Sequence, residues 1–193
     1  MELKLLLQII GVALGLLYLW LEYKANILLW VIGLVMPIVH CALYFHSGLY
    51  ADATMQGYYI AAGIYGLCAW IAGRRKTEGK TIIVHAPRRI ILPTIAVYTL
   101  LHVAIYYALV TFTDSTVPFW DSTTTALSIV AMWLLSRRYV EQWLVWLVVD
   151  CITVGLYIYK GIPLTAALYA LYSALAVVGY MRWRRLAREQ ASA

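Results

Sequence analysis

Residues 140–159 have the sequence VEQWLVWLVVDCITVGLYIY. The stretch contains no Lys or Arg, and its two acidic residues are Glu141, next to the start, and Asp150. Twenty residues of α-helix rise about 30 Å, which is the thickness of the hydrocarbon core of a bilayer. We therefore expect a transmembrane helix here, with the carboxyl group of Asp150 near its middle.

The rest of the chain has the same character. Of its 193 residues, 64% are hydrophobic and 12% are charged, and the mean hydropathy is +0.78. Soluble domains are about half apolar and one quarter charged, so this chain predicts an all-α polytopic membrane protein. Seven apolar runs are expected to be transmembrane helices: Leu5–Leu21, Ile27–Phe45, Ala53–Ala72, Ile90–Phe112, Thr123–Leu135, Val140–Tyr159 and Leu164–Trp183.

The fifth run is the shortest of the seven. Three consecutive threonines, 123–125, occupy its first turn, and Asp121 lies just before them. Aspartate is a favoured N-cap residue because its carboxylate accepts hydrogen bonds from the first free backbone N–H groups. We therefore expect a helix that begins near Asp121 and is capped by it.

The basic residues predict the orientation of the chain. With seven crossings, only Lys4 and Lys160 of the 15 Lys and Arg residues lie on the side of the N-terminus. Cytoplasmic loops of membrane proteins carry the excess of Lys and Arg, so the N-terminus is expected outside and the C-terminus in the cytoplasm. The same distribution explains the net charge of +6 without nucleic acid as a partner.

An internal repeat links the two ends of the chain. Shifting the sequence by 113 residues aligns three pairs of tryptophans and two pairs of glycines without a gap: Trp20 with Trp133, Trp30 with Trp143, Trp70 with Trp183, Gly48 with Gly161, and Gly66 with Gly179. A three-helix unit changes sides of the membrane, and one linker helix restores the original side, so the two units are expected to be parallel. Such repeats are a transporter architecture with the substrate site near the midplane.

The repeat gives the domain boundaries. Residues 1–73 form the first three-helix repeat, and residues 74–112 contain a basic cytoplasmic loop and the linker helix. Residues 113–186 form the second repeat, and residues 187–193 are a cytoplasmic tail. The expected fold is thus a 3+1+3 parallel repeat of seven transmembrane helices.

Five side chains of the sixth helix share one face, because they are spaced by three or four residues. They are Trp143, Trp146, Asp150, Thr153 and Tyr157. A carboxylate at mid-membrane depth needs a cation, a proton or hydrogen-bond donors, and no Lys or Arg is expected at that depth. Aromatic rings attract cations and stack on flat heterocycles. The face therefore predicts a site for a small, aromatic, positively charged substrate.

Further candidates come from three other helices. The third helix contributes Gln56 and Tyr59, and the seventh contributes Tyr169 and Tyr172 at matching positions. For the tyrosines, helix packing is an equally good explanation, whereas a lone amide in the membrane favours ligand contact for Gln56. In the second helix, His40 follows a mid-helix proline and is either a neutral structural histidine or a ligand or proton-relay group.

Other classes of function fit the sequence poorly. The three cysteines lie inside apolar runs without metal-ligand spacing, so neither a disulfide framework nor a metal or cofactor site is expected. No nucleophile or paired-carboxylate motif predicts an enzyme. A retinal-based photoreceptor would need a lysine in the middle of a helix, and Lys160 lies at a helix end.

Several short motifs resemble the Pnu family of bacterial vitamin transporters. They include Leu49-Tyr50-Ala51-Asp52 with Gln56, Phe119-Trp120-Asp121-Ser122, and above all Glu141-x-Trp143-x-x-Trp146. The resemblance covers nearly the whole chain. It implies a 3+1+3 arrangement distantly like that of the SWEET sugar transporters, in the bacterial inner membrane. It also implies facilitated diffusion without ATP, trapping by a cytoplasmic kinase, and ligand contacts at Gln56, Trp143, Trp146 and position 150.

Family members carry nicotinamide riboside or thiamine, and both are cationic aromatic heterocycles. The nicotinamide riboside pattern has Asn four residues after the second Trp, where this chain has Asp150. An ionised Asp cannot donate a hydrogen bond to a carboxamide, but it suits an aminopyrimidine. This departure favours thiamine, with nicotinamide riboside as the alternative. Proton coupling through Asp150 or His40, and a homo-oligomer, both stay open.

Overall fold

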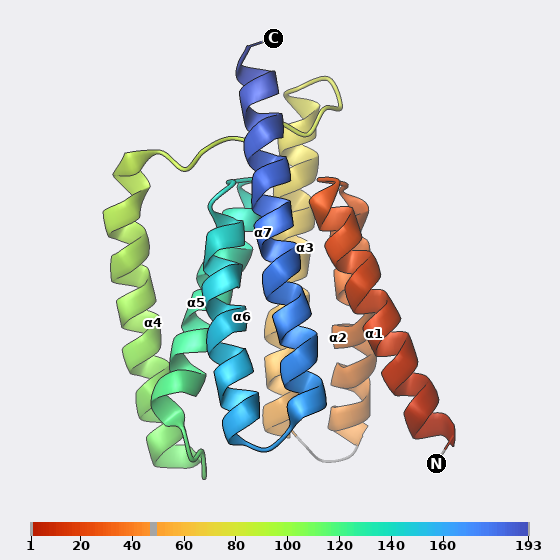
Figure 1. The fold of residues 1–193 in the computed structure, drawn as a ribbon, viewed down its shortest axis with the longest axis vertical. Coiled ribbons are helices and arrows are strands. Elements are labelled where there is room, and N and C mark those ends of the chain that lie inside the picture. Colours follow the sequence, from red (N-terminus) through yellow and green to blue (C-terminus); the bar gives the residue numbers. More distant parts are fainter. Residues whose placement is uncertain (1, 47–49, 193) are drawn as a thin grey trace. The chain divides into compact units, whose positions relative to one another are not determined.

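A computed structural model describes residues 2–46 and 50–192, and within these ranges the chain forms seven α-helices and one 3₁₀-helix (Figure 1). In chain order they are α1 (Glu2–Tyr23), α2 (Leu28–His46), α3 (Tyr50–Arg75), η1 (Arg88–Ile90), α4 (Ile91–Phe112), α5 (Pro118–Ser136), α6 (Gln142–Tyr159) and α7 (Pro163–Ala191). Each predicted run overlaps one of these helices, so the seven-helix prediction is confirmed. The expected pairing of Gly48 with Gly161, and Leu49 of the first motif, lie outside the described residues.

The start of α5 differs from the prediction. The helix begins at Pro118, and its N-cap residue, Val117, makes no side-chain capping hydrogen bond. The prediction that Asp121 caps this helix is therefore wrong. Proline suits the first helical position because its fixed φ matches the helix and its missing N–H needs no partner there. Asp121 instead accepts a 2.7 Å hydrogen bond from Ser115 and lies 3.8 Å from the ammonium group of Lys160.

The helices form two compact units, Met1–Ile82 and Ile83–Ala193, and the second contains α4 together with α5, α6 and α7. Three described helical segments are long and apolar enough to cross a membrane: Arg88–Phe112, Gln142–Tyr159 and Pro163–Ala191. Two shorter apolar segments, Val12–Tyr23 and Leu28–Ala42, lie in α1 and α2. No residue of α4 is buried, which fits a helix that faces hydrocarbon over most of its surface.

In each unit a buried tryptophan is packed on a glycine of a neighbouring helix. In the first unit, the ring of Trp30 lies against Gly66 and meets Trp70 edge-on at 6.0 Å and 76°. In the second unit, Trp143 lies against Gly179 and meets Trp183 edge-on at 5.9 Å and 85°. All four tryptophans are at most 2% exposed. A glycine lets the ring approach the helix backbone, so each contact closes one helix pair tightly.

The turn before each of these tryptophans also has the same conformation in both units. Ala25, between α1 and α2, has φ 51°, and Arg138, between α5 and α6, has φ 62°. The N–H of Ala25 donates to the carbonyl of Glu22, and that of Arg138 donates to Leu135. One residue earlier, Lys24 lies over the ring of Trp20, and Arg137 lies over the ring of Trp133. Every member of these sets is 113 residues from its counterpart.

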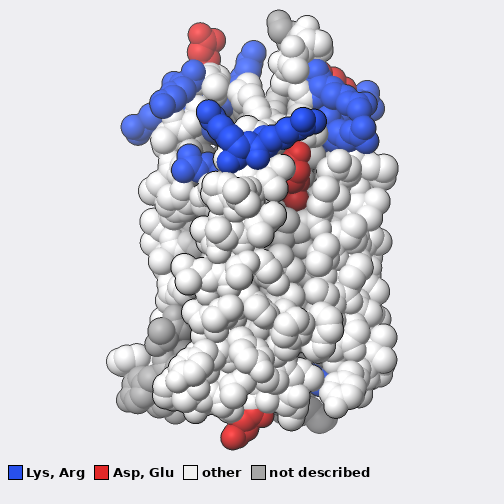
Figure 2. All heavy atoms as spheres, turned by 90° about the vertical axis from the view of Figure 1, so that its left-hand side faces the viewer, with Lys and Arg blue, Asp and Glu red and all other residues white. Residues whose placement is uncertain are grey.

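The arginines of the second unit lie at one end of its helices, and its lysine, Lys160, lies at the other end, after α6. The arginines belong to η1, to the turn between α5 and α6, and to the last turns of α7. On the face shown in Figure 2, Lys and Arg side chains gather in a band at one end, and acidic side chains appear at the opposite end. The arginines of the second unit are Arg88, Arg89, Arg137, Arg138, Arg182, Arg184, Arg185 and Arg188. Burial, and secondarily the neighbouring Arg137, lowers the pKa of Arg138 from its usual value. A band of this kind is typical of the cytoplasmic rim of a membrane protein.

A four-residue segment, 83–86, is attached to the same end of the second unit. Val84 exchanges backbone hydrogen bonds with Arg138 and Val140, and the N–H of Ile83 donates to the side chain of Gln190 at 2.8 Å. Glu141 receives two contacts of 2.8 Å, from the ring nitrogen Nδ1 of His85 and from the backbone N–H of Ala86. Both carboxylate oxygens of Glu141 are therefore engaged in holding this segment.

We expect Glu141→Ala to reduce the stability of the protein by about 1–2 kcal/mol, because it removes two hydrogen bonds to a partly exposed carboxylate. The matched control is Glu189→Ala, which removes only an exposed pair with Arg185 and should change stability by less than about 0.5 kcal/mol. Unfolding in detergent, followed by tryptophan fluorescence, measures both. Equal effects of the two substitutions would contradict a structural role for Glu141.

Candidate functional site

Asp150 is the central polar residue of α6. It is 7% exposed and lies within electrostatic range of Tyr172 in α7. Its helix is one of the three segments that can cross a membrane. A buried carboxylate in such a segment is costly, so the presence of Asp150 near the middle of α6 points to a functional role.

Three tyrosines of the predicted site form a chain of ring contacts, and one of them, Tyr172, interacts electrostatically with Asp150. The ring of Tyr157 in α6 stacks on Tyr169 in α7, with centroids 5.5 Å apart and planes at 19°. Tyr169 in turn meets Tyr172 edge-on at 5.6 Å. The three tyrosines are thus linked by ring contacts, and Tyr172 is linked to Asp150 electrostatically; we call these four residues the Asp150 cluster. A carboxylate attracts a cation, and the faces of neighbouring aromatic rings can hold a flat heterocycle by stacking.

The two tryptophans of α6 have different surroundings. Trp143 is 2% exposed, and its indole N–H has no hydrogen-bond partner among the described residues. It is enclosed by Gly179 and Trp183, so in this conformation it packs two helices together. Trp146 is only half-buried. Of the two, Trp146 has the ring surface that a ligand could reach without rearrangement of α6 and α7.

Thr153 contributes less than expected. Its hydroxyl is half-buried and donates a 2.7 Å hydrogen bond to the carbonyl of Val149, one turn earlier in α6. This bond to the helix's own backbone satisfies the donor of Thr153. The hydroxyl oxygen can still accept a hydrogen bond, so a ligand contact by Thr153 stays a prediction.

The remaining candidates belong to the first unit. Gln56, Tyr59 and His40 are all half-buried. Tyr59 meets its neighbour Tyr58 edge-on at 5.4 Å. By the 113-residue offset, His40 corresponds to Thr153, Gln56 to Tyr169, and Tyr59 to Tyr172. The candidates of the first unit therefore occupy the positions equivalent to candidates of the second.

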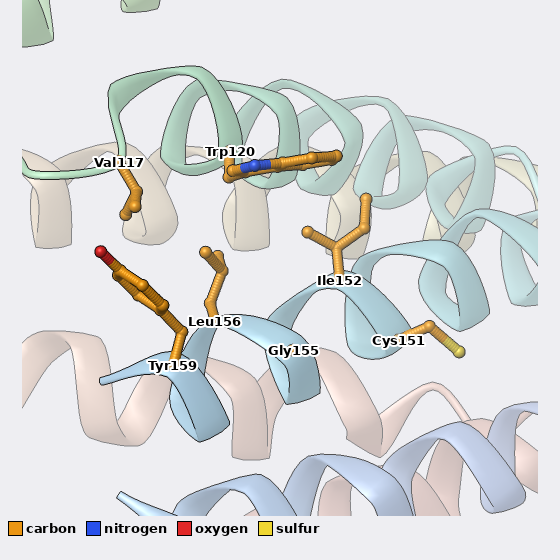
Figure 3. A pocket seen from close by; sticks show the side chains of 7 residues that line it. All are labelled: Val117, Trp120, Cys151, Ile152, Gly155, Leu156 and Tyr159. Atoms are coloured by element: carbon orange, nitrogen blue, oxygen red, sulfur yellow. The ribbon is translucent and has the colours of Figure 1, made fainter. Parts of the chain in front are cut away.

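A cavity of about 530 Å³ lies on another face of α6 (Figure 3). Its floor is formed by residues of α6 around Gly155, and the ring of Trp120 from α5 lies across from Ile152. The full lining is Val117, Trp120, Cys151, Ile152, Gly155, Leu156 and Tyr159. None of these residues is charged, and by helical spacing they point away from Asp150 and Tyr157. The cavity therefore does not match the predicted cation site.

The structure also identifies a polar residue that the sequence analysis missed, His102. It lies in the middle of α4, with Nδ1 at 3.2 Å from the hydroxyl of Ser122 in α5. Its ring stacks between Tyr98 and Tyr106 and meets Phe119 edge-on. The hydroxyl of Ser122 also lies 2.9 Å from the carbonyl of Phe119, and when it donates to that carbonyl its oxygen can accept from the Nδ1–H tautomer of His102. His102 thereby fastens α4 to α5. Its mid-helix position was the available signal.

Comparisons with known proteins agree on one family. The profile of the family described as "Nicotinamide mononucleotide transporter" matches residues 5–185. The nicotinamide riboside transporter PnuC of Escherichia coli strain K12 is 29% identical, over 96% of this chain and 88% of its own length. The riboflavin/roseoflavin transporter RibM of Streptomyces davaonensis is 28% identical, over 91% of this chain and 83% of its own length.

A solved structure has the same fold. The crystal structure of the vitamin B3 transporter PnuC superimposes with a TM-score of 0.68 at 24% sequence identity. The match covers 91% of this chain and 79% of the other.

Proposed function

This chain belongs to the nicotinamide mononucleotide transporter family, and from that premise we propose that it carries nicotinamide riboside across the membrane. The relatives named above are transporters rather than enzymes, and the apolar helices of this chain agree with a multi-pass membrane protein. Nicotinamide riboside is a flat, positively charged pyridinium ring with a carboxamide and a ribose. The positive charge, the ring and the carboxamide each have a matching partner among the candidate residues.

The observation that carries the proposal is the cluster of Asp150 with Tyr172, Tyr169 and Tyr157. The carboxylate balances the charge of the pyridinium, and the tyrosine rings and Trp146 offer faces for stacking. In the first unit, the amide of Gln56 can both donate to and accept from a carboxamide. These groups form the substrate-binding set that we propose, together with Tyr59, His40 and Thr153.

Thiamine, which Asp150 favoured in the sequence analysis, is not supported by the relatives. Those named here transport nicotinamide riboside or riboflavin and roseoflavin. An aspartate can replace an asparagine beside a cationic ring because it still accepts hydrogen bonds and adds an opposite charge. We therefore place nicotinamide riboside first and keep thiamine and riboflavin as competing substrates in the experiment below.

The transport mechanism that we propose is facilitated diffusion, with trapping of the vitamin by a cytoplasmic kinase. We also propose that the chain lies in the bacterial inner membrane with the N-terminus outside, because the arginines at η1, at the turn between α5 and α6 and at the end of α7 then lie in the cytoplasm. The 3+1+3 parallel repeat is part of the proposal. The matching tryptophan–glycine contacts and turns of the two units support it.

Uptake by purified protein in liposomes tests the substrate. We expect saturable uptake of radiolabelled nicotinamide riboside, competition by unlabelled nicotinamide riboside, and weaker competition by thiamine and riboflavin. Uptake should persist when an uncoupler collapses the proton gradient. Transport of thiamine or riboflavin without nicotinamide riboside would refute the substrate, and uptake abolished by the uncoupler would refute facilitated diffusion.

A further inference from the structure

The cavity around Gly155 forms a groove along an exposed face of α6 (Figure 3). Cys151, Gly155 and Tyr159 follow one another at single turns of the helix and are all exposed, and Trp120 of α5, on the opposite wall, is 46% exposed. From Cys151 to Tyr159 the helix rises about 12 Å. These residues form the second half of a segment that can cross a membrane, so the groove covers about the depth of one leaflet.

The lining of the groove suits an acyl chain. It contains no charged side chain, and the ring of Trp120 faces Ile152 and Leu156 of α6 across the groove. Gly155 leaves the floor free, because a Cβ at this position would meet no atom within 4 Å. A hydrocarbon chain lying in the groove would gain dispersion contacts with the walls on both sides.

Two opposite charges lie at one end of the groove. Tyr159 and Trp120 line it, and the residues that follow them in the chain are Lys160 and Asp121. Nζ of Lys160 is 3.8 Å from Oδ1 of Asp121, and the two side chains are 38% and 32% exposed. The hydroxyl of Ser115 donates a 2.7 Å hydrogen bond to Oδ2 of Asp121. The apolar groove therefore ends at a cation and an anion that lie next to each other and within reach of the membrane surface.

The pair of Lys160 and Asp121 can bind a further group that carries both charges. Their separation of 3.8 Å is longer than an N–H···O hydrogen bond, which measures about 2.7–3.2 Å. A phosphate can accept from the ammonium of Lys160, and a primary ammonium can donate to the carboxylate of Asp121. A phospholipid with an ethanolamine headgroup carries a phosphate, a primary ammonium and the acyl chains in one molecule.

From the groove and this charge pair we propose that the second unit binds one molecule of phosphatidylethanolamine. One acyl chain lies in the groove beside Gly155, the phosphate lies at Lys160, and the ammonium lies at Asp121. All of these residues belong to the second unit. The lipid site is separate from the substrate site, because the groove and Asp150 lie on different faces of α6. The bound lipid covers the contact between α5 and α6 at this end of the helices.

Native mass spectrometry of the delipidated protein in detergent tests the choice of lipid. The protein is titrated with phosphatidylethanolamine, phosphatidylcholine and phosphatidylglycerol that have identical acyl chains. We expect one tightly bound phosphatidylethanolamine per chain, with an affinity about fivefold higher than for the other two lipids, the effect of one charge contact at a membrane surface. Phosphatidylcholine has no N–H to donate to Asp121, and phosphatidylglycerol has no ammonium.

Variants of the groove and of its charged end test the position. Gly155→Phe fills the groove and should lower the affinity for phosphatidylethanolamine roughly tenfold, because the acyl chain loses its contacts. Lys160→Met should lower the affinity for all three lipids about fivefold, and Asp121→Asn should remove the preference for phosphatidylethanolamine. The matched controls are Leu100→Phe, at a 71% exposed position of α4, and Lys80→Met, at an exposed position before η1. Both should keep the wild-type affinity.

Three results would overturn the proposal. The first is equal affinity of the wild type for the three lipids, or a Gly155→Phe protein that binds phosphatidylethanolamine like the wild type. The second is a wild-type oligomer that dissociates in Gly155→Phe without loss of lipid, because the groove would then belong to a second copy of the chain. The third is displacement of the lipid by nicotinamide riboside, which would assign the groove to the substrate. If Gly155→Phe does not fold, Gly155→Leu takes its place with the same expected loss.

Discussion

Replacing Asp150 with alanine is expected to weaken nicotinamide riboside binding by roughly 10- to 100-fold, which corresponds to about 1.5–3 kcal/mol for a contact to a charged group. The side chain is 7% exposed, so little water is present to screen its charge or to replace it. Alanine removes the only carboxylate of α6 that lies within the span, since Glu141 precedes the helix. Titration of purified protein with the ligand measures the loss.

The control for the change in charge is Asp114→Ala, which removes an exposed carboxylate from the loop before α5. It should leave binding unchanged, because the charge of an exposed carboxylate outside the helices is screened by water and salt. Asp150→Asn should cost less nicotinamide riboside affinity than Asp150→Ala, because the amide can pair with the carboxamide. Binding that is equal in wild type and Asp150→Ala would remove Asp150 from the site.

The second large effect is expected at Gly179. A Cβ at this position would lie 2.7 Å from three ring atoms of Trp143, and the ring is held in place by Trp183. Gly179→Ala should therefore destabilise the protein by about 1–3 kcal/mol, and Gly179→Val by more. Gly66→Ala should act in the same direction, because a Cβ there would overlap the ring of Trp30. The midpoint of thermal unfolding in detergent measures these changes.

Gly155 is the matched control for both substitutions. It lies inside α6, and a Cβ there would meet no atom within 4 Å. Gly155→Ala should be neutral or stabilise the protein by up to about 1 kcal/mol, because alanine has the higher helix propensity. Opposite signs at Gly179 and Gly155 are thus expected. Equal small effects would show that the tryptophan rings can move aside and that these contacts do not close the helix pairs.

Hydrophobic runs predicted the helices well because each run must cover the same thickness of hydrocarbon. The error at α5 came from taking Asp121 as the cap without considering Pro118, three residues earlier. Both residues favour a helix start, and the proline ring at the first position determined it. The choice depends on the backbone conformation of Val117, which the residue types alone do not specify.

The sequence correctly predicted a helix for the residues of this face of α6. It did not predict the surroundings of each side chain on the face. Helical spacing places Trp143 and Trp146 together, yet only the former meets a glycine of α7 and is enclosed. That difference depends on how α6 and α7 pack, which spacing within one helix does not contain. The role of Glu141 was equally inaccessible, because its partners His85 and Ala86 are more than fifty residues away in the chain.

His102 could have been found from the sequence. Like His40, it lies in the middle of a long apolar run, where a polar residue is costly. Its partner Ser122 could not have been, because the register of α4 against α5 is a property of the packed pair. Sequence patterns therefore show which polar residues lie in the middle of apolar runs, whereas only the structure shows which residues they contact.

A structure of the protein determined with nicotinamide riboside tests the central claim most directly. We predict density for the pyridinium ring next to Asp150, in contact with Trp146 and the tyrosines Tyr169 and Tyr172. Density for the ligand in the cavity around Gly155, or elsewhere with the Asp150 cluster unchanged and empty, would contradict it.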